Sequence, residues 1–346
     1  MKRARALPLA LVFLLCLSVA FPIVYNIISE VDVHGTALAD SWAYIEIYKG
    51  TSLETIAQPF RYRLFTPYLA RLVPAPPRSA AVLYDLAAEK VIKFRFGMVD
   101  ALCLAGAGLF LFLLCEALGL PAVESLLGSV LFLGGHAVIN YAGGPMTDAA
   151  SYLFLCAAIL CALRNWRWGL FLSVLVGMLA KETTGYVLAP ILFLPTPARD
   201  RIAKVLLCLP GILIYLGFRL TVRAASPHDF AIGNPFVNVW ERLHSARRML
   251  FTGIEGWLAF GVVWVFAVWG FWILARRGSW RSPILRLAVL VPVAVAMPIL
   301  LDANVARMSY LAFPAVIPLA LVAVDRLFGD ARRTGEPAAA GGGASP

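Results

Sequence analysis

Charged residues are scarce in this sequence, which has 346 residues and is 14% charged and 61% apolar. A soluble domain carries about 25% charged residues, so this composition excludes an ordinary soluble protein. The apolar residues form blocks of about 17–25 residues between charged clusters, the length that crosses a hydrocarbon core. The sequence therefore predicts a polytopic integral membrane protein.

Disulfide and metal-binding patterns are also missing. There is no CxxC pair, and the six cysteines lie within apolar blocks, where buried free thiols are expected. The histidines, His34, His136, His228 and His244, show no metal-ligand spacing. The net charge of +10 does not indicate nucleic-acid binding, because the basic residues stand at the ends of apolar blocks, where they orient helices.

An all-α bundle of ten membrane spans is predicted. The first runs from residue 6 to residue 28. Ser18-Val19-Ala20 resembles a signal-peptide cleavage site, but the apolar run continues past it, which favours a retained helix. The other nine spans are expected near residues 96–118, 122–140, 148–163, 169–180, 184–195, 205–220, 253–275, 283–301 and 310–327.

Orientation depends on blocks 169–180 and 184–195, which are each too short to cross alone. If they formed one long helix, every later segment would change sides. Basic residues favour the cytoplasmic side of a membrane. The chain has four basic clusters, at residues 164–167, 199–204, 276–281 and 332–333. All four lie on the cytoplasmic side only if Lys181 lies in a turn at the outer face. Both termini are then cytoplasmic. The excess of Arg (24) over Lys (6) is typical of a GC-rich bacterial genome, so we expect a bacterial inner membrane.

Residues 1–330 are predicted to form one transmembrane module, and 331–346 a disordered cytoplasmic tail. Two long loops, 29–95 and 219–252, are expected outside, with amphipathic helices lying on the membrane. Their predicted apolar faces are Trp42, Ile45 and Tyr48; Tyr68, Leu69, Leu72 and Val73, after Thr66 as N-cap; Leu83, Leu86, Ala87, Val91 and Phe94; and Phe236, Val239, Trp240 and Leu243, after Asn234-Pro235.

Four segments deliver charge to the outer face in this topology. They carry Asp40, Asp148, the Lys181-Glu182 pair and Arg307. Charged groups at membrane depth are costly and are therefore functional candidates. We expect these four segments to share one cavity. Asp100, Glu116 and Glu124 are interpreted instead as helix-end or interhelical residues.

The order of these residues resembles the GT-C superfamily of polytopic glycosyltransferases, which take sugars from polyprenyl-phosphate carriers. The resemblance covers most of the chain and rests on no single specific motif. The matching features are Asp40, then Tyr44 and Tyr48 in an amphipathic helix, the stretch from Gln58 to Pro67 with Arg61 and Arg63, the Pro145-x-x-Asp148 pattern, Lys181-Glu182, and Arg307 followed by Tyr310 and Pro314.

The resemblance implies an inverting glycosyltransferase that transfers a sugar to a glycan, lipid or protein. It implies Asp40 as the catalytic residue, and Tyr44, Arg61, Arg63, Asp148, Lys181, Glu182, Arg307 and Tyr310 as substrate-binding residues. No cofactor is expected beyond the lipid-linked donor. The first loop lacks Asp-x-Asp, so a divalent metal is not favoured. The implied partners are membrane lipids, the donor and the acceptor.

The chemistry fits these residue types. Sugar transfer needs a base for the acceptor hydroxyl and a cationic site for the leaving phosphate. A carboxylate with an ordinary pKa is ionised at neutral pH, so Asp40 suits the base. Arginine forks match phosphate oxygens, which suits Arg61, Arg63 and Arg307.

Each candidate also has a purely structural interpretation. Asp40 is equally explained as an N-cap, and Asp148 as a charge at the positive end of a helix. Lys181 and Glu182 fit a salt-bridged turn. Arg61 and Arg63 fit contacts with lipid headgroups. Arg307 is the strongest cationic candidate, since it is isolated.

Two other functions stay open at this point. A transporter or flippase for a lipid-linked or anionic substrate would use the short pair 169–180 and 184–195 as broken helices, although no internal repeat is found. A non-catalytic assembly subunit would tolerate loss of Asp40. An acyltransferase is less favoured, because no His-x4-Asp pattern occurs.

Overall fold

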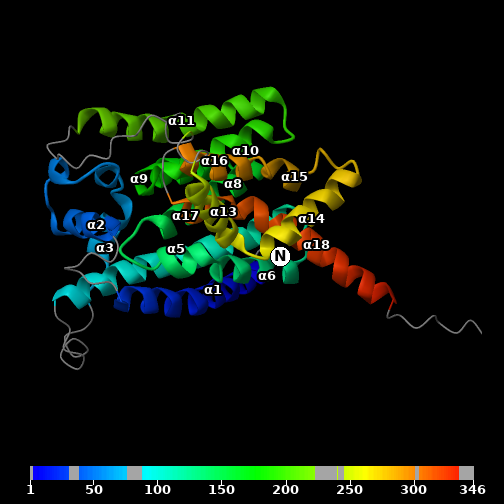
Figure 1. Cartoon of the computed structure of the whole chain (residues 1–346), viewed down its shortest axis with the longest axis horizontal. Helices are drawn as coiled ribbons and strands as arrows, with labels where there is room; N and C mark the ends of the chain where they lie inside the picture. Colours follow the sequence, from blue (N-terminus) through cyan, green and yellow to red (C-terminus); the bar gives the residue numbers. More distant parts are fainter. Residues whose placement is uncertain are drawn as a thin grey trace, which may run out of the picture.

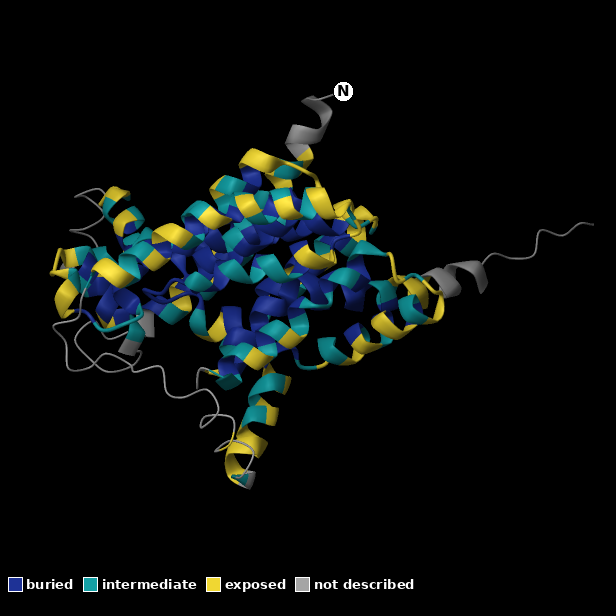
Figure 2. Ribbon diagram, turned by 90° about the horizontal axis from the view of Figure 1, so that it is seen from above, coloured by how far each residue is buried: buried dark blue, intermediate teal, exposed yellow. Residues whose placement is uncertain are grey.

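The computed structural model describes residues 3–30, 39–75, 88–222, 240, 245–300 and 304–334. In these ranges the chain forms helices and no strands, which confirms the predicted all-α class (Figure 1). Buried residues lie along the middle of the bundle and exposed ones on its outer helices (Figure 2).

Six helices of the described residues are long and apolar enough to cross a membrane, or seven if one bent pair counts as a single span. They cover Pro8–Ile28, Lys90–Ala117, Ala122–Tyr141, Ala198–Thr221, Pro283–Leu300 and Val305–Phe328. Two further apolar helices, α8 (Asp148–Leu163) and α9 (Arg167–Ala180), are shorter. The chain is therefore a membrane protein.

The long helix α5 (Ala88–Ala117) is the centre of the bundle. It packs against α1 (Arg3–Glu30) on one side and against α8 and α6 (Ala122–Leu133) on others. Helix α9 packs against α8, and α11 (Ala198–Thr221) covers α9. Because α8 packs between α5 and α9, its first turn, which begins with Asp148, is buried inside the bundle.

The predicted span 253–275 is wrong as a single straight helix. It consists of α13 (Ala246–Phe260) and α14 (Val263–Arg276), which are bent by 78°. The break is at Gly261, whose φ of 52° lies in the left-handed region that stops a right-handed helix. An apolar run gives no sign of such a break.

Four other predicted spans each consist of two helical pieces. Block 122–140 comprises α6 and α7 (His136–Tyr141), and block 184–195 comprises the 3-10 helix η3 (Glu182–Val187) and α10 (Leu188–Phe193). Block 283–301 comprises α15 (Pro283–Leu287) and α16 (Leu290–Leu300). The final block follows α17 (Val305–Ser309) and comprises η4 (Tyr310–Ala312) and α18 (Phe313–Thr334). The first four residues of the predicted tail are thus helical, and 335–346 lie outside the described residues.

The described part of the first loop lies at one end of the bundle (Figure 1). It contains α2 (Ala39–Lys49), η1 (Leu53–Thr55), η2 (Phe60–Tyr62) and α3 (Phe65–Leu72). Helix α2 packs on both η2 and α3, and α3 packs on α5. The loop is therefore a folded cap on the helix bundle.

Two details of the loop prediction are wrong. Trp42 is 56% exposed, whereas Ile45 is buried, so these residues do not share one packed face. Helix α3 begins at Phe65 with Leu64 as N-cap, not with Thr66. Of the last two predicted faces, Leu83, Leu86, Ala87, Phe236, Val239 and Leu243 lie outside the described residues. Val91 and Phe94 belong to α5.

Gly270 permits backbone contact between α14 and α18. A Cβ atom on Gly270 would overlap the backbone carbonyl oxygen of Leu319, so the two helices would have to separate. We expect Gly270→Ala to lower the stability of the purified protein by about 1–3 kcal/mol, measured by thermal unfolding in detergent. The control is Gly253→Ala on α13, where a Cβ meets nothing within 4 Å. Equal stability of the two variants would contradict this packing.

Candidate functional site

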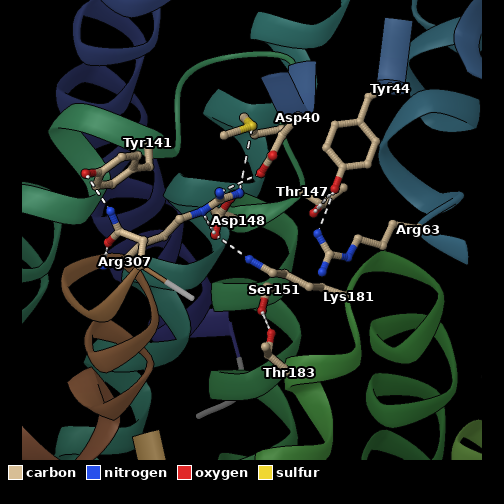
Figure 3. Close-up of polar contacts among 12 residues, drawn as sticks. Asp40, Tyr44, Arg63, Tyr141, Thr147, Asp148, Ser151, Lys181, Thr183 and Arg307 are labelled. Atoms are coloured by element: carbon tan, nitrogen blue, oxygen red, sulfur yellow. Dashed lines mark hydrogen bonds and ion pairs between the residues drawn. The ribbon is translucent and has the colours of Figure 1, made fainter. Parts of the chain in front are cut away.

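Arg307 is the centre of a charged cluster that joins distant parts of the chain (Figure 3). It lies in the short helix α17, where the Asn304 side chain accepts a hydrogen bond from its backbone N–H at 2.8 Å. Its Nη1 donates to Oδ2 of Asp40 at 2.6 Å. Its Nε and Nη2 donate to the carboxylate of Asp148 at 2.5–3.1 Å. One guanidinium group thus bridges two carboxylates.

Lys181 completes the same cluster from the end of α9. Its Nζ lies 2.7 Å from Oδ1 of Asp148, and the side chains are 3% and 2% exposed, respectively. Below this pair, the hydroxyls of Ser151 and Thr183 lie 2.7 Å apart (Figure 3). Asp148 is therefore held by two cations and is enclosed by protein.

A second cluster surrounds Arg63, which follows η2. Its Nε donates to Glu182 at 2.9 Å, a second guanidinium nitrogen pairs with the same carboxylate, and Nη1 donates to the hydroxyl of Tyr44 at 2.9 Å. That hydroxyl lies 3.4 Å from the hydroxyl of Thr147. Because Thr147 precedes Asp148 and Lys181 precedes Glu182 in the chain, the two clusters are adjacent.

The Arg63–Glu182 pair is ionised. Burial by itself would raise the pKa of the Glu182 carboxyl, but the Arg63 guanidinium holds that pKa below its ordinary value. Burial raises the pKa of the Tyr44 hydroxyl, so Tyr44 stays protonated at neutral pH. Tyr44 therefore connects the two clusters as a neutral group.

The expected convergence of the four charged segments is confirmed by the contacts among Asp40, Asp148, Lys181 and Arg307. Arg63, Glu182 and Tyr44 join them through the second cluster. The residues contributing to the two clusters come from α2, the segment after η2, α8, the α9–η3 junction and α17.

Two predicted substrate-binding residues have other surroundings. Tyr310 is buried among Phe132, Phe260 and Phe313, and its hydroxyl donates to the backbone carbonyl of Phe132. Its contacts are those of a packed core residue. Arg61 is 1% exposed, donates to the carbonyl of Ile56 at 3.4 Å and lies over the ring of Tyr62.

Several structural interpretations from the sequence are also resolved. Lys181 and Glu182 do not pair with each other but with Asp148 and Arg63, so the salt-bridged turn is wrong. The headgroup interpretation is wrong for both Arg61 and Arg63, because both are buried in protein. Asp40 is the second residue of α2 and its carboxylate binds Arg307, so the N-cap interpretation is wrong. Asp148 is the first residue of α8, whose N-cap is Thr147, so it does lie at the positive end of a helix.

Some polar residues of the site do not stand out in the sequence. Thr147, Ser151 and Thr183 are buried within or beside the charged clusters, and their only sequence signal is their nearness to Asp148 and Lys181. Asp100 lies in the middle of α5, so of its two interpretations the helix-end one is wrong and the interhelical one agrees with its burial. It is fully buried, and neither carboxyl oxygen has a hydrogen-bond partner among the described residues.

The positive and negative charges of the two clusters balance each other. In the described ranges, no group of three or more His, Cys, Asp or Glu side chains is arranged to hold a metal ion. Three cations and three carboxylates meet in the two clusters. Arg307 and Asp40 are partly accessible, with side chains 14% and 23% exposed. A guanidinium group at an accessible edge can bind a phosphate or carboxylate.

Comparisons of this chain with the known protein families, with curated proteins and with solved structures give no match. Any inference of function therefore rests on the residues of the two clusters and their geometry.

Proposed function

We propose that this protein transfers a sugar from a polyprenyl-phosphate carrier to a glycan, lipid or protein acceptor, as a glycosyltransferase of GT-C type. The observation that supports this proposal is the bridge formed by Arg307 between Asp40 and Asp148. It puts a partly exposed carboxylate within 2.6 Å of a partly exposed guanidinium nitrogen. A base and a phosphate-binding cation are thereby adjacent.

In the proposed reaction, the acceptor hydroxyl oxygen attacks the anomeric carbon of the donor sugar. Asp40 takes the proton of that hydroxyl as general base. The bond between the anomeric carbon and the phosphate oxygen breaks, and the bonding electron pair leaves with the polyprenyl phosphate. Arg307 stabilises the charge on this leaving group. Attack opposite the leaving group inverts the anomeric configuration.

The first loop suits a lipid-linked donor. Helix α3 lies beside α2, which carries Asp40, and exposes Tyr68 (44%) and Leu72 (78%) one helical turn apart. An apolar stripe on a short helix suits a position in the membrane interface. There it would contact the prenyl chain while the phosphate reaches Arg307.

We place the clusters at the outer face of a bacterial inner membrane, with both termini in the cytoplasm. Ten crossings require α8, α9 and the η3–α10 segment to count as spans. Short helices of this kind are tolerated where they are enclosed by other helices, and α8 is largely buried.

A transporter or flippase for a lipid-linked or anionic substrate is the second candidate. The interrupted segments at residues 134–135 and 181–187 favour it, because broken helices often form transport sites. Against it, the charges lie at the ends of α9 and α2 and at the first turn of α8, not within a repeated pair of helices.

Purified protein in vesicles separates these two functions. The vesicles would contain polyprenyl-phosphate donors that each carry one radiolabelled hexose or pentose. Sugar transfer predicts label in the acceptor or, without acceptor, released by slow hydrolysis. Movement of intact donor between leaflets with no cleavage would support transport and contradict sugar transfer.

We expect transfer activity to fall above about pH 8, because Lys181 then loses its proton and its ion pair with Asp148. Burial lowers the pKa of Lys181 from 10.5 to about 8, despite the attraction of Asp148. In this range the unfolded chain binds more protons than the folded protein, so this group favours folding increasingly as pH rises. Activity and stability should therefore change in opposite directions.

The pH profile of Lys181→Arg tests this expectation, since arginine keeps its charge across the range. The activity of this variant should stay level between pH 8 and pH 10. A decline equal to that of the wild type would show that another group causes it.

A further inference from the structure

The two carboxylates on Arg307 are held in different ways. Asp148 binds two guanidinium nitrogens, Nε and Nη2, and also pairs with Lys181. Asp40 binds the remaining nitrogen, Nη1, through Oδ2. The Asp148 side chain is 2% exposed and the Asp40 side chain is 23% exposed. The Asp40 contact is therefore the one that solvent or a ligand reaches.

Asp148 is fixed and Asp40 is easier to move. Asp148 begins α8, which is buried along most of its length. Asp40 is in the first turn of α2, which belongs to the loop cap rather than to the spanning bundle. If Asp40 withdrew, Arg307 would keep its orientation, because two of its nitrogens would still be bound to Asp148.

Charge balance indicates what can take the place of Asp40. Arg307 and Lys181 carry two positive charges, and Asp40 and Asp148 carry two negative charges. A further anion would add an uncompensated charge in a poorly solvated place, which is costly. An anion that replaces Asp40 on Nη1 leaves the balance at Arg307 unchanged. A phosphate diester, with one negative charge, meets this condition.

We propose that Nη1 of Arg307 is an exchange position at which the monoanionic phosphate of the donor displaces Asp40. The displaced carboxylate is then free to take the proton of the acceptor. Without donor, Arg307 is paired with the Asp40 carboxylate, which therefore cannot act as the base. With donor bound, the same arginine binds the donor phosphate instead. The identity of the ligand as a sugar donor rests on the proposed function, whereas the exchange itself concerns only anion binding.

Lys181 and Asp148 act as positioning residues in this scheme. Their ion pair holds the carboxylate that orients the guanidinium plane of Arg307. By this exchange a charge-balanced cluster can bind an anion. Binding is a substitution of one anion for another, so the affinity measures the competition between Asp40 and the ligand.

Equilibrium binding of farnesyl phosphate to the purified protein in detergent at about pH 5, where this phosphate monoester carries about one negative charge, tests the exchange without any transfer step. Removing the competing charge by Asp40→Asn should tighten binding by at least about fivefold, as expected for coupled ligands. Arg307→Gln should abolish binding. The control is Glu46→Gln, which removes a carboxylate of the same helix that pairs with Lys49 at the surface. It should bind like the wild type.

Two further probes identify what is recognised. Farnesol, which lacks the anion, should not compete, and inorganic phosphate should compete only weakly if the prenyl chain contributes. Equal competition by inorganic phosphate would assign the position to free phosphate and overturn its assignment to a lipid-linked donor. Unchanged or weaker farnesyl phosphate binding by Asp40→Asn would overturn the exchange. Tighter binding in a protein that transfers no sugar would retain the exchange and reject the proposed function.

Discussion

Replacing Asp40 with asparagine is expected to reduce sugar transfer by about 10²–10⁴-fold, the usual contribution of a general base. The amide has the shape of the carboxylate but cannot accept the proton of the acceptor hydroxyl. It also cannot form the 2.6 Å ion pair with Arg307. The measurement is the single-turnover rate of transfer from saturating donor, so that a change in donor affinity does not enter the result.

The matched control for this loss is Glu46→Gln, on the same helix α2. Glu46 pairs with Lys49 and accepts a hydrogen bond from Thr51 at the surface. Its loss should leave the transfer rate within about twofold, as expected for an exposed ion pair. An Asp40→Asn protein that transfers at the wild-type rate would remove the base from the mechanism.

The second large effect is expected from Arg307→Lys, which should lower transfer by about 10²–10³-fold, as loss of a charge-stabilising donor does. Lysine keeps the positive charge but presents one nitrogen in place of three. It therefore cannot hold Asp148 with two nitrogens and leave a third for the donor phosphate. We expect the affinity for farnesyl phosphate to fall together with the rate.

Arg164→Lys is the corresponding control for charge conservation. Arg164 is exposed at the end of α8, and it donates to the carbonyl of Leu113 at a distance of 3.5 Å. This variant should transfer normally. If Arg307→Lys were as active as Arg164→Lys, a fork of guanidinium nitrogens would not be needed.

The sequence was sufficient to predict the membrane class and the residues of the charged cluster around Arg307. Blocks of apolar residues have the length that a bilayer requires, and this signal does not depend on packing. Asp40, Asp148, Lys181 and Arg307 stand out because the predicted topology places all four on the same side of the membrane. Their convergence follows once the segments that carry them share one end of the bundle.

The partners within the cluster could not be predicted. Lys181 and Glu182 are neighbours in the chain, which suggested that they pair with each other. The backbone of Lys181 is extended (φ −163°, ψ 137°), so the two side chains point in different directions. Lys181 pairs with Asp148, and Glu182 pairs with Arg63. Pairing of this kind depends on backbone torsion angles that residue types alone do not specify.

The breaks in the predicted spans also depend on backbone torsion angles that residue types alone do not specify. Gly261 interrupts α13 and α14, but a glycine in an apolar run is equally compatible with a continuous helix. Tyr310 has a similar explanation. Its position near Arg307 in the sequence suggested a ligand role, but the turn at η4 directs its ring into the aromatic core with Phe132 and Phe313.

The coupling between Asp40 and Arg307 in the transfer step is tested most directly by a double-variant cycle on the transfer rate. If the base and the phosphate site act as one unit in the transfer step, the Asp40→Asn, Arg307→Lys protein should be about as slow as the slower single variant. Losses that multiply, so that the double variant falls by the product of the two single effects, would show that the two residues act independently.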